Sequence, residues 1–497
     1  MKYFIGLDLG TSGVKAVLFD EKGQIVSDSV YEYKLYVPKE NYAEQDALEW
    51  KEGTILALNN LLIKANIDNK EILGLGISGQ MHGLVLLDKN NNPLRKVIIW
   101  CDGRAVKQSE ELNALFGEDN LIRITGNKAL PALTASKLLW IKENEPDVFN
   151  NIAHIMLPKD YINYVLTGVF RSEPSDSSGT QLFDINKKDW SLEIISKLGI
   201  NKDALSKIID SDEVVGNITE EISKLTGLST SCIVCAGAGD QPAAALGNGV
   251  IKQGQSSCSL GSSGVIFLPI SKPIGVKGSV LQTFCHCVKD TWTMMGVTQG
   301  CGISLTWIKN NYYPNDSYQK MNEDAKSVGI GANKTIFLPY LLGERSPILN
   351  HNARGILFGI KTNTNRAVIA RAVMEGVAYS IYHCYEYASN ITGSLNEIYL
   401  AGGGAKSECL VDSLTDIFGE KTIKTNSVES GALGVAILSS VASGYYKSIE
   451  EAVNNMISIV SYQEPLLSNK EEYLRYYQIY KDLYVSNKEM FEKLNKI

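Results

Sequence analysis

Two short segments repeat one residue pattern about half a chain length apart. Residues 9–14 read Leu-Gly-Thr-Ser-Gly-Val, and residues 260–265 read Leu-Gly-Ser-Ser-Gly-Val. Apolar residues surround both segments, so each predicts a strand, a glycine-rich turn and a second strand. A repeat at this spacing predicts two domains of one topology. We expect a first domain over residues 1–247 and a second over residues 248–497, with a hinge near residues 246–252.

The two glycine-rich turns are suited to bind an anion. Successive backbone N–H groups in such a turn can form an anion-binding concavity. Neither turn is a Walker A loop, because the GxxxxGK[ST] pattern is absent and a strand follows instead of a helix. One such hairpin is usually only a turn, but two on facing domains would hold a polyphosphate from both sides. The turn residues are Gly10, Thr11, Ser12 and Gly13, and Gly261, Ser262, Ser263 and Gly264.

Asp240 lies in a glycine- and alanine-rich segment between an apolar strand at residues 232–235 and a helix start at Pro242. A side chain on such a strand-to-helix turn projects into the ligand-binding crevice of α/β folds. The alternative is that Asp240 caps the following helix, because Asp is a preferred N-cap residue. With the ordinary Asp pKa near 3.9, it would be ionised at pH 7 and able to accept a proton. Asp8, before the first hairpin, is a candidate ligand for a cation.

A third glycine-rich segment supplies polar side chains in a loop. Residues 74–79 match GxGxxG by letter, but an expected strand at residues 84–87 follows, and a dinucleotide site requires a helix there. Gln80, Met81 and His82 stand between these two strands. Polar loop residues on a rigid sheet often bind ligands, although a lone loop histidine is more often a surface residue.

The remaining segments predict mostly helices. Residues 96–104 read as a strand that ends in Trp100, Asp102 and Arg104, and helical patterns cover residues 105–151 and 366–392. The segments 155–161 and 172–180 read as loops or turns, and 190–230 as peripheral helices. Residues 292–307 and 396–412 each read as strand, glycine-rich turn and helix. Tyr473, Tyr476, Tyr477, Tyr480, Leu483 and Tyr484 form one helical face that should dock on the second domain.

Charge and cysteine usage exclude several classes of protein. The net charge of −7 argues against a general nucleic-acid binder, which normally carries a basic excess. No apolar run reaches the length of a membrane span, and the first residues lack a signal-peptide pattern, so we expect a cytoplasmic protein. The nine cysteines have scattered spacings, which predicts buried thiols more than a metal or redox site, including at Cys232 and Cys235.

Together these segments resemble the FGGY family of carbohydrate kinases, and within it the xylulokinases. The resemblance covers about residues 3–440 and includes GLDLGTSGVKAVLFD, GISGQMHGLVLLD, SEPSDSSGTQLFD and CAGAGDQPAAALGNG. It implies an α/β fold of two ribonuclease H-like (actin-like ATPase) domains facing a central cleft. The implied activity is phosphorylation of D-xylulose to D-xylulose 5-phosphate with ATP and Mg²⁺. The implied partners are the sugar and ATP, without nucleic acid or membrane; a homodimer is one possible assembly.

The resemblance also implies roles for individual residues. Asp240 corresponds to the general base, and Asp8 to an acid near the metal and the phosphates; both are metal candidates. The implied sugar-binding residues are Gln80, Met81, His82, Trp100, Asp102, Asp240 and Gln241. The implied nucleotide-binding residues are Gly10, Thr11, Ser12, Gly261, Ser262, Ser263, Gly302, Thr306, Gly403, Gly404 and Glu408. The chain departs from the family pattern at Cys101, which replaces a common Asn, at Ser262, which replaces a Thr, and at Val368, where a polar residue is frequent.

Two alternatives stay open at this point. Another kinase of the family, for gluconate, L-ribulose or glycerol, would share most of the motifs. A carboxylate substrate would require cationic residues in the first domain, where Arg104 is the one candidate. An actin-like ATPase that forms filaments or acts as a chaperone would share the hairpins and the glycine triplet. It would not require Gln80, Met81 and His82, or a base placed to meet a sugar.

Overall fold

The first half of the chain forms a mixed seven-stranded sheet with the order β13-β14-β5-β1-β2-β3, and β15 also pairs with β5. The computed structural model describes residues 1–497, apart from the side chain of residue 390. Strands β1 and β2 form the first predicted hairpin, with Leu9 opposite Val14. The strands are β1 (Tyr3–Leu9), β2 (Gly13–Asp20), β3 (Ile25–Glu32), β5 (Ile72–Gly79), β13 (Val214–Asn217), β14 (Ile233–Cys235) and β15 (Ala238–Gly239).

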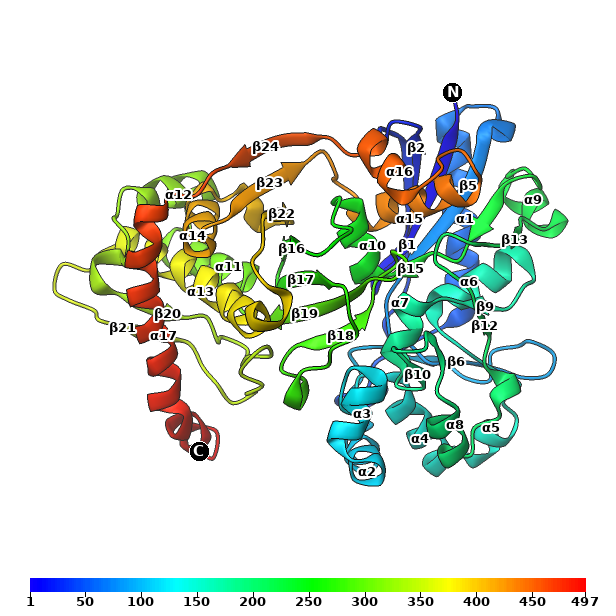
Figure 1. The fold of residues 1–497 in the computed structure, drawn as a ribbon, viewed down its shortest axis with the longest axis horizontal. Coiled ribbons are helices and arrows are strands. Elements are labelled where there is room, and N and C mark those ends of the chain that lie inside the picture. Colours follow the sequence, from blue (N-terminus) through cyan, green and yellow to red (C-terminus); the bar gives the residue numbers. More distant parts are fainter.

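The second half repeats this arrangement in a second seven-stranded sheet, with the order β18-β19-β17-β16-β22-β23-β24. Here β16 and β17 form the second hairpin, and β22 is the parallel neighbour of β16 as β5 is of β1. The two sheets lie in two lobes (Figure 1). The α/β class with two units of one topology is therefore confirmed. The strands are β16 (Gln255–Leu260), β17 (Gly264–Ile270), β18 (Gln282–Cys285), β19 (Trp292–Thr298), β22 (Glu397–Ala401), β23 (Lys421–Thr425) and β24 (Ile459–Gln463).

Helices cover the sheets, and short strand pairs lie between the helices of the first lobe. The helices of the first half are α1 (Ala47–Ala65), α2 (Val106–Phe116), α3 (Glu118–Thr125), α4 (Thr134–Asn144), α5 (Pro146–Asn150), α6 (Pro158–Thr167), α7 (Pro174–Ser177), α8 (Leu192–Leu198), α9 (Glu220–Thr226) and α10 (Asp240–Gly247). Those of the second half are α11 (Gly302–Tyr312), α12 (Tyr318–Lys326), α13 (Arg366–Thr392), α14 (Glu408–Phe418), α15 (Ser430–Ala442), α16 (Ile449–Met456) and α17 (Leu467–Leu494). The short strands are β4 (Glu44–Gln45), β6 (Val85–Leu87), β7 (Val97–Ile98), β8 (His154–Met156), β9 (Arg171–Ser172), β10 (Phe183–Asp184), β11 (Asp189–Trp190), β12 (Lys207–Ile208), β20 (Ile336–Leu338) and β21 (Ile356–Phe358).

Three expectations about these elements need correction. Residues 155–161 are not a loop, because α6 begins at Pro158, where proline is tolerated in the first helical turn. The segment 172–180 contains the short helix α7. Residues 190–230 are only partly helical, since β13 joins the first sheet beside β14. Helix α7 is capped by the Glu173 side chain, and β13 forms by pairing with β14, so contacts beyond a periodic pattern decide these two short segments.

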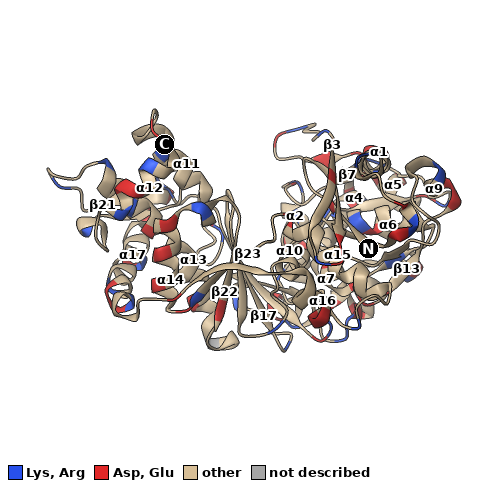
Figure 2. Ribbon diagram, turned by 90° about the horizontal axis from the view of Figure 1, so that it is seen from above, with Lys and Arg blue, Asp and Glu red and all other residues tan. Residues whose placement is uncertain are grey.

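Helices α15 and α16 belong to the second half of the sequence but pack on the first sheet, as Figure 2 also shows. The contact is close because glycines face backbone: a Cβ atom on Gly6 would overlap the carbonyl oxygen of Ala432, and one on Gly434 would overlap that of Ala243. The chain therefore passes between the lobes after α10, after β23 and again after α16. The predicted boundary at residue 247 does not anticipate the last two crossings.

The long helix α13 and the tyrosine face of α17 lie in the core of the second lobe. Tyr473, Tyr477 and Tyr480 are buried, and the Tyr340 hydroxyl donates a 2.8 Å hydrogen bond to the Tyr480 hydroxyl. The predicted docking face is thus confirmed. Eight of the nine cysteines are buried free thiols, and Cys101 is the exposed exception. Within the described part of the chain, no helix is both long and apolar enough to cross a membrane.

Candidate active site

The carboxyl ends of three neighbouring parallel strands bring the predicted first-lobe residues together. In the register of the sheet, Leu9 of β1 and Gly239 of β15 both lie opposite Gly79 of β5. Asp8 precedes Leu9 by one residue, and Gln80 and Asp240 follow Gly79 and Gly239 by one residue. Strand ends of this kind are where α/β folds bind their ligands. Three segments far apart in the sequence thus converge on one edge.

Asp240 is the first residue of α10, and it does not act as the N-cap. The N-cap residue is Gly239, which has no side chain to accept a hydrogen bond from the first N–H groups of the helix. The pKa of Asp240 is raised to about 7, mainly because burial disfavours the charged carboxylate and also because Asp8 is close. Hydrogen bonds from the backbone and side chain of Gln241 act in the opposite direction. The expectation of an ordinary Asp pKa is therefore wrong, and the shifted value suits a general base near neutral pH.

Asp8 occupies the middle of the same edge. Its Oδ1 atom accepts a 3.0 Å hydrogen bond from Ser78 Oγ. Burial raises its pKa, while that hydrogen bond lowers it; of the nearby charges, Glu429 raises it and Lys15 lowers it. Gly431, at the start of α15, faces this carboxylate, and a Cβ atom there would lie 3.5 Å from Asp8 Oδ1.

The chemistry of these two carboxylates fits Mg²⁺, which prefers oxygen ligands. The charge of Asp8 helps to raise the pKa of Asp240, so the two carboxylates lie near one another. Among the described residues, no group of three or more His, Cys, Asp or Glu side chains is arranged to hold a metal ion. A pair of carboxylates is what Mg²⁺ uses when phosphate oxygens and water complete its coordination.

Gln80 links the predicted sugar loop to the first hairpin. Its Nε2 atom donates to the carbonyl oxygen of Gly10 at 3.2 Å and to Gln45 Oε1 at 2.7 Å. Gln45 in turn donates to the carbonyl oxygen of Thr11 at 2.6 Å. The Oε1 atom of Gln80 is buried without a hydrogen-bond partner in the described structure. Because a buried polar atom normally has a partner, this oxygen is available to a ligand hydroxyl.

His82 is held in a left-handed backbone conformation, with φ at +69°. Its carbonyl oxygen accepts hydrogen bonds from Thr134 Oγ1 at 3.1 Å and from Lys137 Nζ at 2.9 Å. Burial lowers the pKa of His82 to about 3, so the ring is neutral at physiological pH. The Nδ1 atom lies 3.1 Å from the carbonyl oxygen of Gly179, which requires the proton on Nδ1. The Nε2 atom is then a hydrogen-bond acceptor.

Met81 and Trp100 also border this region, from two different segments. Met81 is buried and packs with Phe284 and Met295 of the second lobe. Trp100 is 40% exposed, and its Nε1 atom donates to Thr11 Oγ1 at 2.9 Å. Trp100 therefore lies beside the first hairpin, where an exposed indole can contact a ligand.

Asp102 differs from the other predicted sugar-binding residues because its carboxylate is already engaged. Its Oδ2 atom accepts from the Ala43 N–H at 2.5 Å, and both oxygens accept from the guanidinium of Arg104. The Arg104 side chain is 1% exposed and also pairs with Glu44 at 2.7 Å. The arrangement supports the loop that carries Trp100, and the sugar-binding role of Asp102 stays a prediction.

The nucleotide residues predicted in the second lobe converge on a second strand edge. Strands β16 and β22 are parallel, with Ser259 opposite Ala401, so the second hairpin and the glycine triplet at residues 402–404 follow neighbouring strands. The Gly302 N–H donates to the carbonyl oxygen of Gly261 at 2.8 Å, which places the start of α11 against the hairpin. A Cβ atom on Gly402 would lie 2.9 Å from the carbonyl oxygen of Leu260. No atom lies within 4 Å of the Cβ position of Gly403.

Thr306 and Glu408 lie at the outer part of this second edge. Thr306 is exposed on α11, and its Oγ1 atom lies 3.5 Å from the hydroxyl of Tyr318. Glu408 begins α14 and forms an exposed ion pair of 2.8 Å with Lys326. Both side chains are open to solvent, and a bound ligand could reach either.

A cluster of buried charged residues behind Asp240 was missed by the sequence analysis. Lys159, Glu173 and Asp176 are each 0% exposed, and Asp160 is 2% exposed. Both carboxyl oxygens of Asp176 lack a hydrogen-bond partner in the described structure, and burial raises the pKa of this group well above its usual range. The segment SEPSDSSGT contains Glu173 and Asp176, but small polar residues are also the ordinary composition of a surface loop, so the sequence carries no clear signal of burial.

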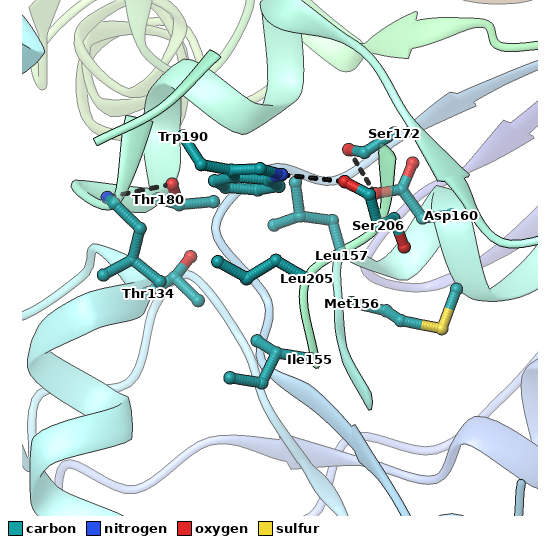
Figure 3. A pocket seen from close by; sticks show the side chains of 11 residues that line it. Thr134, Ile155, Met156, Leu157, Asp160, Ser172, Thr180, Trp190, Leu205 and Ser206 are labelled. Carbon is teal, nitrogen blue, oxygen red and sulfur yellow. Dashed lines mark hydrogen bonds between the residues drawn. The ribbon is translucent and has the colours of Figure 1, made fainter. Parts of the chain in front are cut away.

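Figure 3 shows a cavity of about 10 Å³ beside this cluster, where Ser172 donates to Asp160 at 2.6 Å. That volume holds about one water molecule and excludes a sugar. A wider hollow of about 690 Å³ lies beside β11 and β12. Neither cavity is lined by a predicted site residue, so the candidate site remains the pair of strand edges.

Comparisons with known proteins show which proteins this chain resembles in sequence and fold. The model for the N-terminal domain of the FGGY family of carbohydrate kinases matches residues 3–247, and the C-terminal domain model matches residues 256–443. The chain is 37% identical to the xylulose kinase of Bacillus subtilis, over 99% of this chain and 98% of that protein. It is similar to the crystal structure of a xyloylose kinase from Brucella ovis, with a TM-score of 0.91, 31% identity, and 98% and 100% of the two chains covered. It is also similar to a gluconate kinase from Lactobacillus acidophilus, with a TM-score of 0.93, 26% identity, and 99% of each chain covered.

Proposed function

Because the chain belongs to the FGGY family of carbohydrate kinases, an ATP-dependent family, we propose that its substrate is D-xylulose and its product D-xylulose 5-phosphate. The observation that carries the proposal is the convergence of Asp8, Gln80 and Asp240 on one sheet edge. The long alignments with proteins named xylulose kinase support the choice of sugar.

In the proposed reaction, Asp240 accepts the proton of the attacking sugar hydroxyl as that oxygen bonds to the γ-phosphorus and ADP leaves. Phosphoryl transfer depends on positioning and on neutralising charge more than on covalent chemistry. The two hairpins donate backbone N–H groups to the phosphates, one from each lobe. Gln80 Oε1 accepts from one sugar hydroxyl and the Nε2 atom of His82 from another.

The expected Mg²⁺ would lie near Asp8, with Asp240 as a second carboxylate. When bound, it would neutralise charge on the phosphate oxygens. The predicted roles of Gly302, Thr306, Gly403, Gly404 and Glu408 in binding the nucleotide rest on their position around the second hairpin.

A gluconate kinase is the strongest alternative within the family. The carboxylate of gluconate would require a free cation, and Arg104 was the candidate in the sequence. Its guanidinium is occupied by Asp102 and Glu44. This engagement removes the one cation that the sequence offered for a carboxylate substrate, and L-ribulose and glycerol remain the neutral competitors of D-xylulose.

A coupled assay of ADP release with D-xylulose, L-ribulose, gluconate and glycerol tests the proposal. We expect the highest kcat/KM with D-xylulose. A higher value with gluconate would overturn the choice of sugar, and ADP release independent of every sugar would overturn the kinase function itself. The cytoplasmic location and the homodimer stay predictions, and the mass of the protein in solution decides the second.

A further inference from the structure

The turn that carries Asp240 depends on a contact from another element. Helix α10 has Gly239 as its N-cap, and a Cβ atom there would lie 2.9 Å from Met81 Cγ. The position therefore excludes the side chains that usually cap a helix. The Gly239 N–H donates instead to Ser175 Oγ at 3.1 Å, and Ser175 lies on α7, 64 positions earlier.

Ser175 is itself held by Glu173, the N-cap residue of α7. The Ser175 hydroxyl donates to Glu173 Oε1 at 2.8 Å, and the Ser175 N–H donates to Oε2 at 2.7 Å. Because the hydroxyl proton is directed to the carboxylate, a lone pair on the same oxygen is directed to the Gly239 N–H. The two hydrogen bonds therefore fix the orientation of the hydroxyl.

The carboxylate of Glu173 is fully engaged and shielded from water. It accepts further hydrogen bonds from the Asp176 N–H at 2.9 Å and from Ser211 Oγ at 2.7 Å. Lys159 Nζ lies 3.3 Å from Glu173 Oε1 and is also 0% exposed. The polar atoms of the Glu173 and Ser175 side chains all have partners, and the low local dielectric strengthens each of these hydrogen bonds.

We propose that Ser175 is a positioning residue for Asp240. The Glu173 carboxylate orients the Ser175 hydroxyl, which accepts from the Gly239 N–H; this relay of two hydrogen bonds holds the first turn of α10. This inference rests on the proposed function of Asp240. Ser175 does for this turn what the N3 glutamate of a capping box does when it bonds the N-cap N–H. The relay ends at the Gly239 N–H, one residue before the proposed base Asp240.

The test compares Ser175→Ala with Ser175→Thr, which keeps the hydroxyl, and with Ser440→Ala as a matched control. Ser440 is also 0% exposed, and its hydroxyl bonds the carbonyl oxygen of Ile437 at 2.7 Å within α15. We expect kcat of Ser175→Ala to fall by about 10- to 100-fold, the scale of a misplaced catalytic group, with KM for D-xylulose and ATP within about twofold. Ser175→Thr should recover most of kcat, and Ser440→Ala should keep it.

A kcat of Ser175→Ala equal to that of Ser440→Ala would overturn the inference, and so would a raised KM with unchanged kcat. If Ser175→Ala does not fold, Ser175→Cys carries the test, because a thiol is a weaker hydrogen-bond partner of similar size. Its kcat should then fall with KM unchanged, and wild-type kcat would contradict the relay. A wild-type protein without sugar kinase activity overturns the proposed function and this inference together; an active wild type with an equally active Ser175→Ala overturns this inference alone.

Discussion

Lys15 Nζ lies 2.6 Å from Glu429 Oε1, although 414 positions separate the two residues. The ion pair joins β2 to the residue that precedes α15, and α15 then brings Gly431 against Asp8. The edge that carries the predicted base and metal ligand is therefore completed by the second half of the chain.

Close packing of α15 on α10 predicts a strong effect of Gly434→Ala. The added Cβ atom would overlap the backbone oxygen of Ala243, which cannot move away as a flexible side chain can. We expect a loss of about 1–3 kcal/mol in the free energy of unfolding, even though alanine favours a helix. Denaturant unfolding measures it. Gly329→Ala, with no atom within 4 Å of its Cβ position, is the control, and equal stability of the two variants would contradict the packing account.

Lys137 should act on sugar binding through His82. Its ammonium group is one of two donors that hold the His82 carbonyl oxygen in the strained left-handed conformation. We expect Lys137→Met to raise KM for the sugar by about tenfold, the effect of leaving one buried carbonyl oxygen with a lost hydrogen bond, with a smaller change in kcat. Lys142→Met is the matched control, since Lys142 lies on the same helix and bonds the carbonyl oxygen of Leu198. If the KM of Lys137→Met is as low as that of Lys142→Met, Lys137 does not act on sugar binding through His82.

The raised pKa of Asp240 predicts the pH dependence of turnover. A general base works in its deprotonated form, and kcat/KM reports the ionisation of the free enzyme, so kcat/KM should rise with pH through about 7 and reach about a tenth of its maximum one pH unit below. The pKa of His82 is lowered to about 3, so this ring stays neutral over the same range. Its titration therefore causes no change in the KM for the sugar near pH 6.5. Steady-state kinetics between pH 5.5 and 9 measure both. A kcat/KM that does not change from pH 5.5 to 8 would mean that Asp240 has an ordinary pKa in the free enzyme.

The parts of the site that local pattern determines could be predicted from the sequence. The hairpins at Gly10 and Gly261, the strand before Asp240 and the long helix α13 each follow from a continuous run of residues. Contacts between distant segments could not be predicted. Nothing near Gly6 in the sequence shows that Ala432 packs on it, and nothing near Gly239 shows that Ser175 holds its N–H.

The same limit applies to the acids Asp102 and Asp240. Asp102 is of a residue type that often binds ligands, but in the folded chain its carboxylate accepts hydrogen bonds from the guanidinium of Arg104 and from the Ala43 N–H. Asp240 has an ordinary pKa in a free chain, but burial and the neighbouring Asp8 raise it. Burial and charge pairing are properties of the folded chain, so neither could be derived from residue types alone.

The most direct test of the central claim is the turnover of Asp240→Asn with D-xylulose and ATP, measured together with the affinity of the variant for the sugar. Asparagine keeps the size of the side chain and removes the base. The account predicts that kcat falls by about 10²- to 10⁴-fold while the sugar still binds with similar affinity. Near wild-type turnover in a folded Asp240→Asn would contradict it.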